Sequence, residues 1–217
     1  MIAILQFLGT NCDRDMQYAY QDKLQKEVAM VWHKETALPH NTKLVVLPGG
    51  FSYGDYLRSG AIARFAPIMK ALLAHADNGG LVLGICNGFQ ILTESKLLPG
   101  ALKRNAGLSF ISKHQELIIQ NTDNKFLQSY QKGQSITLPI AHADGNYFAD
   151  ASTLESLKAN NQILLTYKDN VNGSLENIAG ICNKDKNVFG LMPHPERAIE
   201  KILGNDEGLE MLRSLGA

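Results

Sequence analysis

Cys86 lies between two glycines in "LVLGICNGFQIL", where an apolar run ends and an amphipathic pattern begins. In Gly84-Ile85-Cys86-Asn87-Gly88 the glycines remove Cβ atoms that would clash in a sharp turn from strand to helix. A helix N-terminus beyond the turn stabilises a thiolate. An unpaired cysteine is more often an ordinary buried residue, but this glycine spacing favours a nucleophile.

A histidine and a glutamate stand two residues apart in "GLMPHPERA", after the apolar run "NVFGLM". In an extended backbone the side chains of His194 and Glu196 project to the same side, and Pro195 restricts the chain between them. One carboxylate then holds one imidazole, and the other ring nitrogen is left to act as a base toward a nucleophile. The alternative is a solvated polar pair at a helix start.

A third motif follows another apolar run in "LVVLPGGFSYGDYLRSGAIA". At Pro48-Gly49-Gly50 a bare backbone N–H can approach a ligand closely, as an oxyanion hole requires. A plain surface turn is the alternative, and a phosphate loop is disfavoured because no G-K-[ST] follows. Three such motifs at strand ends together indicate acyl-transfer chemistry.

Short apolar runs alternate with helical patterns along the segments that position these motifs. This alternation is typical of an α/β fold with a parallel sheet. Functional groups in such a sheet gather beyond the carboxyl ends of the strands. Residues 105–147 change to longer, alternating runs that predict added antiparallel strands. We expect one domain over residues 1–217, with helices near residues 13–25, 57–76, 87–95 and 206–215.

The charge composition argues against some classes of binding partner. Lys plus Arg and Asp plus Glu are both 21, so no overall charge favours nucleic acid or a membrane surface. The first residues, "MIAILQFLGTNCDRDM", have no basic segment before the apolar run and no cleavage site, so they predict a strand and not a secretion signal. Cys12, Cys86 and Cys182 have no CxxC or zinc-type spacing. We therefore expect no metal and a reducing, cytoplasmic setting.

The three motifs together resemble the class I, triad-type glutamine amidotransferase family, with its PGG loop, G-x-C-x-G turn and H-P-E. More narrowly, the chain is similar to the glutaminase subunits of phosphoribosylformylglycinamidine synthases. That similarity runs nearly end to end, through "GTNCDRDM", "GGFSYGDYLRSGAIAR", "GICNGFQILTESKLLPGAL", "PIAHADGNY" and "LMPHPERA". It implies a flavodoxin-like fold, an open and mostly parallel sheet with helices on both faces.

The resemblance also implies the reaction. Glutamine would be hydrolysed to glutamate and ammonia through a thioester on Cys86, with His194 as acid and base and Glu196 as its orienter. The backbone N–H groups of Gly50 and Asn87 would hold the oxyanion.

The same resemblance implies substrate contacts at Gln90, Gly49 and Phe51. The ammonia would pass to a separate synthetase subunit that uses ATP and Mg and converts formylglycinamide ribonucleotide to formylglycinamidine ribonucleotide, and a small third subunit is expected. This chain would need no cofactor of its own.

Some features stay outside this scheme. Ala143-Asp144 replaces the family's usual Gly-Glu, which puts fine substrate or interface contacts in question. Cys12 favours a structural role. His142 fits a residue that lines the site or contacts the partner and a hydrogen-bonded loop residue equally. Two other functions stay open: a glutaminase of a different pathway, and a thiol redox sensor, which would have no use for Glu196 beside His194.

Overall fold

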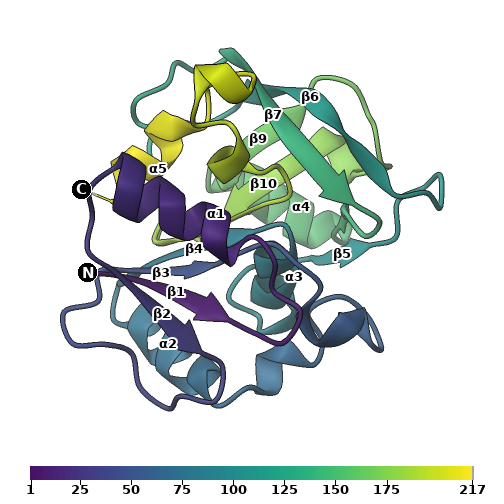
Figure 1. The fold of residues 1–217 in the computed structure, drawn as a ribbon. Helices are drawn as coiled ribbons and strands as arrows, with labels where there is room; N and C mark the ends of the chain where they lie inside the picture. The colour runs from purple at the N-terminus through teal and green to yellow at the C-terminus, as the bar shows by residue number, and fades with distance from the viewer. Residues whose placement is uncertain (217) are drawn as a thin grey trace.

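The computed structural model describes residues 1–216, and nine of their strands form one mixed sheet (Figure 1). The order across this sheet is β2-β1-β3-β4-β11-β10-β9-β6-β7, and β5 pairs with β8 in a small second sheet. The strands are β1 (Ile2–Gln6), β2 (Val28–Trp32), β3 (Leu44–Leu47), β4 (Leu81–Ile85), β5 (Ala101–Lys103), β6 (Ile111–Ile119), β7 (Ser135–His142), β8 (Asn146–Phe148), β9 (Ile163–Tyr167), β10 (Ile178–Cys182) and β11 (Val188–Leu191).

One half of the large sheet is parallel. Strands β2, β1, β3, β4 and β11 run in the same direction, and β3, with the sequence LVVL, is buried along its whole length. This is the pattern of strands covered on both faces, in the 2-1-3-4-5 order of a flavodoxin-like sheet. Because parallel strands share one carboxyl edge, the segments that follow β1, β3, β4 and β11 emerge close together.

The other half is antiparallel. Strands β10, β9, β6 and β7 each pair antiparallel with their neighbours, which gives four antiparallel pairings beside the four parallel ones. Strand β7 alternates between buried and partly exposed residues, as expected where one face is wetter than the other. The predicted α/β class with an added antiparallel region is confirmed, and the sheet is mixed rather than mostly parallel, because β9 and β10 also pair antiparallel.

Helices cover both faces of the parallel strands. Figure 1 shows α1 and α5 on one side and α2 and α3 on the other. A π-helical turn over Tyr18–Lys23 continues α1, close to the predicted span. The helices are α1 (Asp13–Gln17), α2 (Ile68–Asp77), α3 (Asn87–Glu94), α4 (Ala151–Ala159) and α5 (Leu209–Leu215).

The helix predicted over residues 57–76 is wrong in its first half, because α2 begins only at Ile68. Two short 3-10 turns, Ser52–Asp55 and Ala63–Phe65, interrupt the preceding loop. Leu57 has a φ of 69°, a left-handed value that a right-handed helix excludes. Pro67 stands at the start of α2, where the missing N–H of proline costs no helical hydrogen bond.

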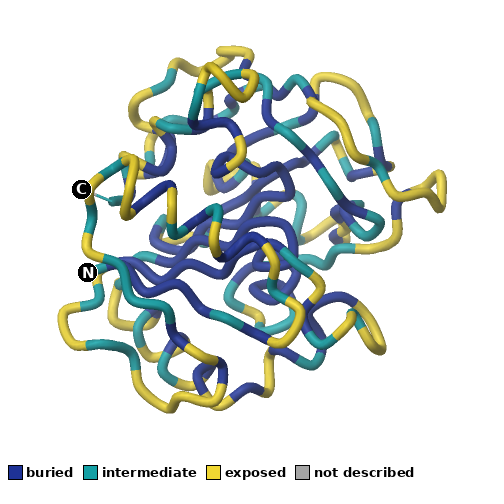
Figure 2. Tube along the Cα trace, viewed as in Figure 1, coloured by how far each residue is buried: buried dark blue, intermediate teal, exposed yellow. Residues whose placement is uncertain are grey.

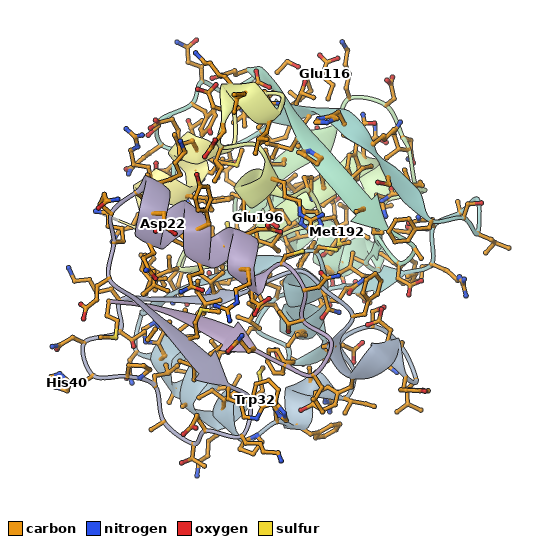
Figure 3. All side chains as sticks on the ribbon, in the orientation of Figure 1. Asp22, Trp32, His40, Glu116, Met192 and Glu196 are labelled. Carbon is orange, nitrogen blue, oxygen red and sulfur yellow. The ribbon has the colours of Figure 1, made fainter. Side chains whose placement is uncertain are left out.

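The core follows the central strands, which are the most buried part of the chain trace (Figure 2). Buried apolar side chains from both halves of the sheet form one cluster. Met192 and Glu196 are buried, whereas Asp22 and His40 are exposed, with His40 at the edge of the view in Figure 3. Within residues 1–216 no helix has the length and apolar character needed to cross a membrane.

The first turn of α3 lies against the end of β3 at a distance that only glycine allows. A Cβ atom on Gly88 would lie 1.9 Å from the carbonyl oxygen of Leu47 and 2.9 Å from its Cβ. The partner atom is backbone of a fully buried strand and cannot move aside cheaply. Gly88 therefore sets how closely the helix that follows Cys86 packs on the sheet.

We predict that Gly88→Ala lowers the free energy of unfolding by at least about 2–3 kcal/mol, because the added methyl overpacks a rigid contact. Urea unfolding followed by circular dichroism measures this change. Gly107→Ala is the matched control, since a Cβ there meets no atom within 4 Å, and a surface change of this kind stays within about 0.5 kcal/mol. Equal stability of the two variants would contradict the packing argument.

Candidate active site

Cys86 occupies a strained turn between β4 and α3. Its φ of 51° and ψ of −105° lie outside the conformations that a side-chain-bearing residue prefers. A Cβ on Gly84 would lie 2.7 Å from the backbone of Gly88, so both glycines are needed for the bend. The N–H of Cys86 donates to the carbonyl of Leu191 at 2.8 Å, which fastens the turn to the end of β11.

His194 and Glu196 lie in the segment that follows the neighbouring strand, β11. Strands β4 and β11 are parallel and in register, with Ile85 opposite Leu191, so both chemical motifs begin at the same level of the sheet. The N–H of His194 donates to the carbonyl of Pro139 on β7 at 2.8 Å. Its Nδ1 lies 2.7 Å from Oε1 of Glu196, and both side chains are buried.

The charge on this pair follows from its surroundings. Burial by itself lowers the pKa of His194, but the negative charges of Glu196 and Cys86 outweigh it and hold that pKa well above its usual value. His194 Nε2 is buried without a hydrogen-bond partner in the described residues. The ring therefore has one nitrogen held by a carboxylate and a second nitrogen free for chemistry.

The PGG loop after β3 lies where these motifs meet. A Cβ on Gly49 would lie 2.7 Å from Cε1 of His194, 3.0 Å from Sγ of Cys12 and 3.5 Å from Cβ of Cys86. Any side chain at position 49 would thus collide with the imidazole of His194 and crowd Cys12 and Cys86. Gly50 has a φ of 153°, and a Cβ on it would lie 2.7 Å from Cα of Thr10.

Two backbone N–H groups are available to a ligand here. Among residues 1–216, neither the N–H of Gly50 nor that of Asn87 has a protein acceptor. Asn87 is the first residue of α3, so its N–H is one of the free donors of a helix start. Gly50 lines the same cavity as Cys86, and Asn87 follows Cys86 directly in the chain.

A cavity of about 150 Å³ opens onto these groups. A larger cavity of about 380 Å³ lies elsewhere, against β9 and α4, and has neither a thiol nor an imidazole in its wall, so the chemistry favours the smaller one. The smaller cavity is lined by Asn11, Cys12, Gly50, Phe51, Cys86, Phe110, Ala141, His194 and Arg197.

Gln90 is not among the lining residues of this cavity. It is buried, with Oε1 accepting from Nδ2 of Asn87 at 2.8 Å and Nε2 donating to the carbonyl of Asp144 at 2.7 Å. Oδ1 of Asn87 in turn accepts from the N–H of Ser52 at 3.1 Å. In the free chain Gln90 is thus part of a relay, a chain of hydrogen bonds that joins the PGG loop, α3 and the turn after β7. Both polar atoms of its side chain already have protein hydrogen-bond partners.

His142 is hydrogen-bonded through one ring nitrogen, whereas its Nε2 is buried without a partner in the described residues. Its Nδ1 pairs with Oδ1 of Asn105 at 3.1 Å, and its side chain is not part of the cavity wall. Burial first, and His194 second, lower its pKa to about 4. His142 is therefore a neutral, hydrogen-bonded histidine of the β7 end.

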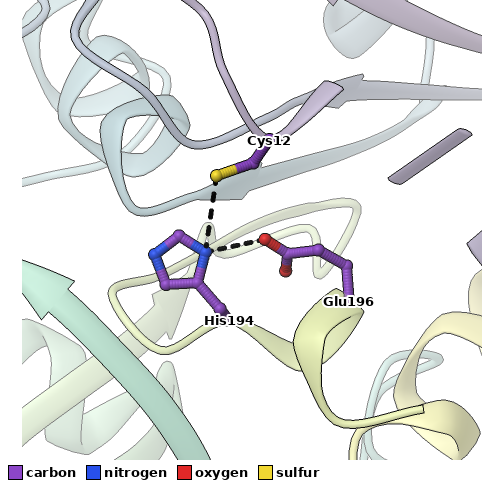
Figure 4. A group of neighbouring side chains, drawn as sticks. All are labelled: Cys12, His194 and Glu196. Carbon is purple, nitrogen blue, oxygen red and sulfur yellow. Dashed lines mark hydrogen bonds and ion pairs between the residues drawn. The ribbon is translucent and has the colours of Figure 1, made fainter. Parts of the chain in front are cut away.

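Sequence reasoning gave no site role to five of the cavity residues, which are Asn11, Cys12, Phe110, Ala141 and Arg197. Sγ of Cys12 lies 4.0 Å from Nδ1 of His194 (Figure 4). It also receives a hydrogen bond from Nη2 of Arg197 at 3.2 Å. One signal could have found Cys12: it follows β1, a parallel strand, just as the other motifs follow theirs. Arg197 extends the H-P-E motif by one residue.

The family is established by comparison with known proteins. The model of the CobB/CobQ-like glutamine amidotransferase domain matches residues 1–208, and the chain belongs to this family. A more distant glutamine amidotransferase structure from Thermotoga maritima, 17% identical, shares the fold with a TM-score of 0.63 over 99% of this chain and 95% of that one.

Nearer relatives are more specific. The chain is 61% identical over 215 residues to the phosphoribosylformylglycinamidine synthase subunit PurQ of Wolinella succinogenes, covering 99% of this chain and 98% of the relative. The subunit of that name from Campylobacter jejuni is 56% identical over 212 residues, with 98% and 94% covered. The structure of PurLQS from Thermotoga maritima contains a chain that is 42% identical, with a TM-score of 0.89 and 99% and 96% covered.

We predict that Glu196→Gln lowers the pKa of His194, because removing the carboxylate charge leaves burial as the dominant influence. Proton NMR of the imidazole over a pH titration measures it, with Glu155→Gln on the exposed face of α4 as control. The raised pKa stabilises the fold fully below the pKa of the unfolded chain, and this contribution is lost as pH rises through the folded value. The variant should therefore lose most stability at low pH, and an unchanged titration would refute the assignment.

Proposed function

We propose that this chain is a single-domain glutaminase that supplies ammonia to a synthetase subunit of phosphoribosylformylglycinamidine synthase in purine biosynthesis. One observation carries the proposal: Cys86 after β4 and His194 after β11 line one cavity, and Glu196 holds the imidazole at Nδ1. The similarity to PurQ subunits over nearly the whole chain supports the choice of pathway.

Cys86 is the proposed nucleophile. His194 accepts its proton, and the thiolate attacks the side-chain amide carbon of glutamine to form a tetrahedral oxyanion. The imidazolium returns the proton to the leaving nitrogen, ammonia departs, and a glutamyl thioester remains. His194 then takes a proton from water, hydroxide attacks the thioester, and glutamate leaves as the proton returns to the sulfur.

The other predicted site residues support these steps. The N–H groups of Gly50 and Asn87 are the proposed oxyanion donors, a role that typically contributes about 10²–10³ in rate per donor. Gly49 and Phe51 shape the cavity for the glutamine side chain. Gln90, predicted as a substrate contact, is better placed to position Asn87.

The acceptor chemistry belongs to a partner. We propose that a synthetase subunit, with ATP and Mg, converts formylglycinamide ribonucleotide to formylglycinamidine ribonucleotide, and that a small third subunit joins the complex. The similarity to a chain of the PurLQS structure supports this. No cofactor is proposed for this chain, and its three free cysteines favour a reducing cytoplasm.

We predict that Cys86→Ala abolishes glutamine-dependent synthesis in the assembled complex and leaves synthesis from ammonium salt intact. The measurement is formation of formylglycinamidine ribonucleotide with each nitrogen source. Cys182→Ala is the matched control, because that thiol is buried on β10 away from the cavity. Loss of both activities in an intact complex would refute the assignment of glutamine hydrolysis to this chain and synthesis to its partner. Normal use of glutamine by Cys86→Ala would refute Cys86 as the nucleophile.

We further predict that the isolated chain hydrolyses glutamine slowly and accelerates when its partner binds. The PGG loop is the proposed switch, since a glycine peptide can rotate and withdraw the Gly50 N–H from the oxyanion without moving the triad. Steady-state hydrolysis is measured with synthetase, nucleotide and acceptor added in turn. Maximal hydrolysis by the free chain, indifferent to every addition, would rule out gating and leave the triad assignment untouched.

A further inference from the structure

A cluster of three different donor atoms lies behind the reactive face of His194. Sγ of Cys12, Nδ1 of His194 and a carboxylate oxygen of Glu196 all lie within 4.8 Å of one another (Figure 4). All three side chains are buried. They come from the segments that follow β1 and β11, so the sheet edge, and not the spacing in the sequence, brings them together.

Sulfur, imidazole nitrogen and carboxylate oxygen are the ligands that zinc takes in proteins, at about 2.3 Å for sulfur and about 2.0–2.2 Å for the others. A tetrahedral ion with such bonds would separate sulfur from nitrogen by about 3.5 Å and nitrogen from oxygen by about 3.3 Å. The observed separations are 4.0 Å and 2.7 Å. The first separation must shorten by about 0.5 Å and the second lengthen by about 0.6 Å, and the separation of sulfur from the carboxylate oxygen, which is within 4.8 Å, must reach about 3.6 Å for zinc to bind all three.

We propose that Cys12, His194 and Glu196 form an inhibitory binding site for a thiophilic divalent cation such as Zn²⁺. Three protein ligands leave one position for water, as in an open zinc site. Cys12 and His194 both line the cavity, so the ion has a path to them.

The electrostatics of the cluster agree with a cation. Oε2 of Glu196 is buried with no hydrogen-bond partner in the described residues, so the carboxylate has an unused ligand atom. Arg197 donates to the sulfur of Cys12, but Asp15 lies 3.1 Å from its guanidinium and offsets its charge. A Cys12 thiolate and the Glu196 carboxylate together balance the two charges of the ion.

Without metal, Cys12 stays a thiol, because burial raises its pKa despite the hydrogen bond from His194. Binding of the ion displaces the thiol proton to solvent. It also requires Nδ1 of His194 to be unprotonated, so the neutral ring must carry its proton on Nε2.

The consequence for activity rests on the proposed function. With its proton on Nε2, His194 has no lone pair facing Cys86 and cannot accept the thiol proton. The ion thus inhibits by fixing the wrong tautomer of the base, without touching the nucleophile.

A direct measurement of Zn²⁺ binding distinguishes this site from simple binding of the ion to the thiol of Cys86. Cys86→Ala protein, with its catalytic thiol removed, is titrated with Zn²⁺ in competition with a chromogenic chelator. We expect one ion per chain. Adding Cys12→Ala to the Cys86→Ala protein should weaken Zn²⁺ binding by more than about 100-fold. That loss exceeds the effect typical of removing a residue that only hydrogen-bonds to a metal ligand. Adding Cys182→Ala, the matched control, should leave it unchanged.

Thermal unfolding with and without Zn²⁺ checks that each variant is folded and reports binding a second way. Cys12→Ser keeps the shape of the side chain and covers the case in which Cys12→Ala fails to fold. Binding that survives removal of Cys12, or that disappears with Cys86→Ala alone, would overturn the site. Zinc binding through Cys12 in a chain that proves inactive on glutamine would keep the site and reject the proposed function instead.

Discussion

The parallel pairing of β4 with β11 is the interaction on which the site depends. It places the end of one strand beside the end of the other in register, and the hydrogen bond from Cys86 N–H to the Leu191 carbonyl continues that pairing past the last residue of β4. A slip of one residue would turn the side chains of one strand to the opposite face. The nucleophile and the base therefore keep their relation only while this register holds.

Close packing imposes the second constraint. A methyl group on Gly49, Gly84 or Gly88 would meet neighbouring atoms at 2.7 Å or less. The neighbour of Gly88 is backbone of β3, that of Gly84 includes backbone of α3, and that of Gly49 is the imidazole of His194. This accounts for a reactive centre with a cavity of only about 150 Å³, large enough for one small side chain and little water.

Much of this arrangement could be predicted from the sequence, because glycine spacing and uninterrupted apolar runs are local signals. The turn at Cys86 and the pairing of His194 with Glu196 depend on residues within a few positions of each other. The contact of Cys12 with His194 spans 182 positions and depends on sheet order, so its only mark in the sequence is that Cys12 follows an apolar strand, as the other motifs do. The helix predicted from residue 57 failed because the left-handed conformation at Leu57 leaves no mark in hydrophobic periodicity.

The relay through Asn87 and Gln90 explains why a sequence change beside the site is tolerable. It begins at the N–H of Ser52 and ends at the carbonyl of Asp144, so main-chain atoms serve at both ends. The side chain at position 144 contributes only an acceptor for the hydroxyl of Ser59, at 2.9 Å. A change of side chain at position 144 leaves this support in place, because the part of the residue that holds the catalytic turn is the carbonyl group that every amino acid shares.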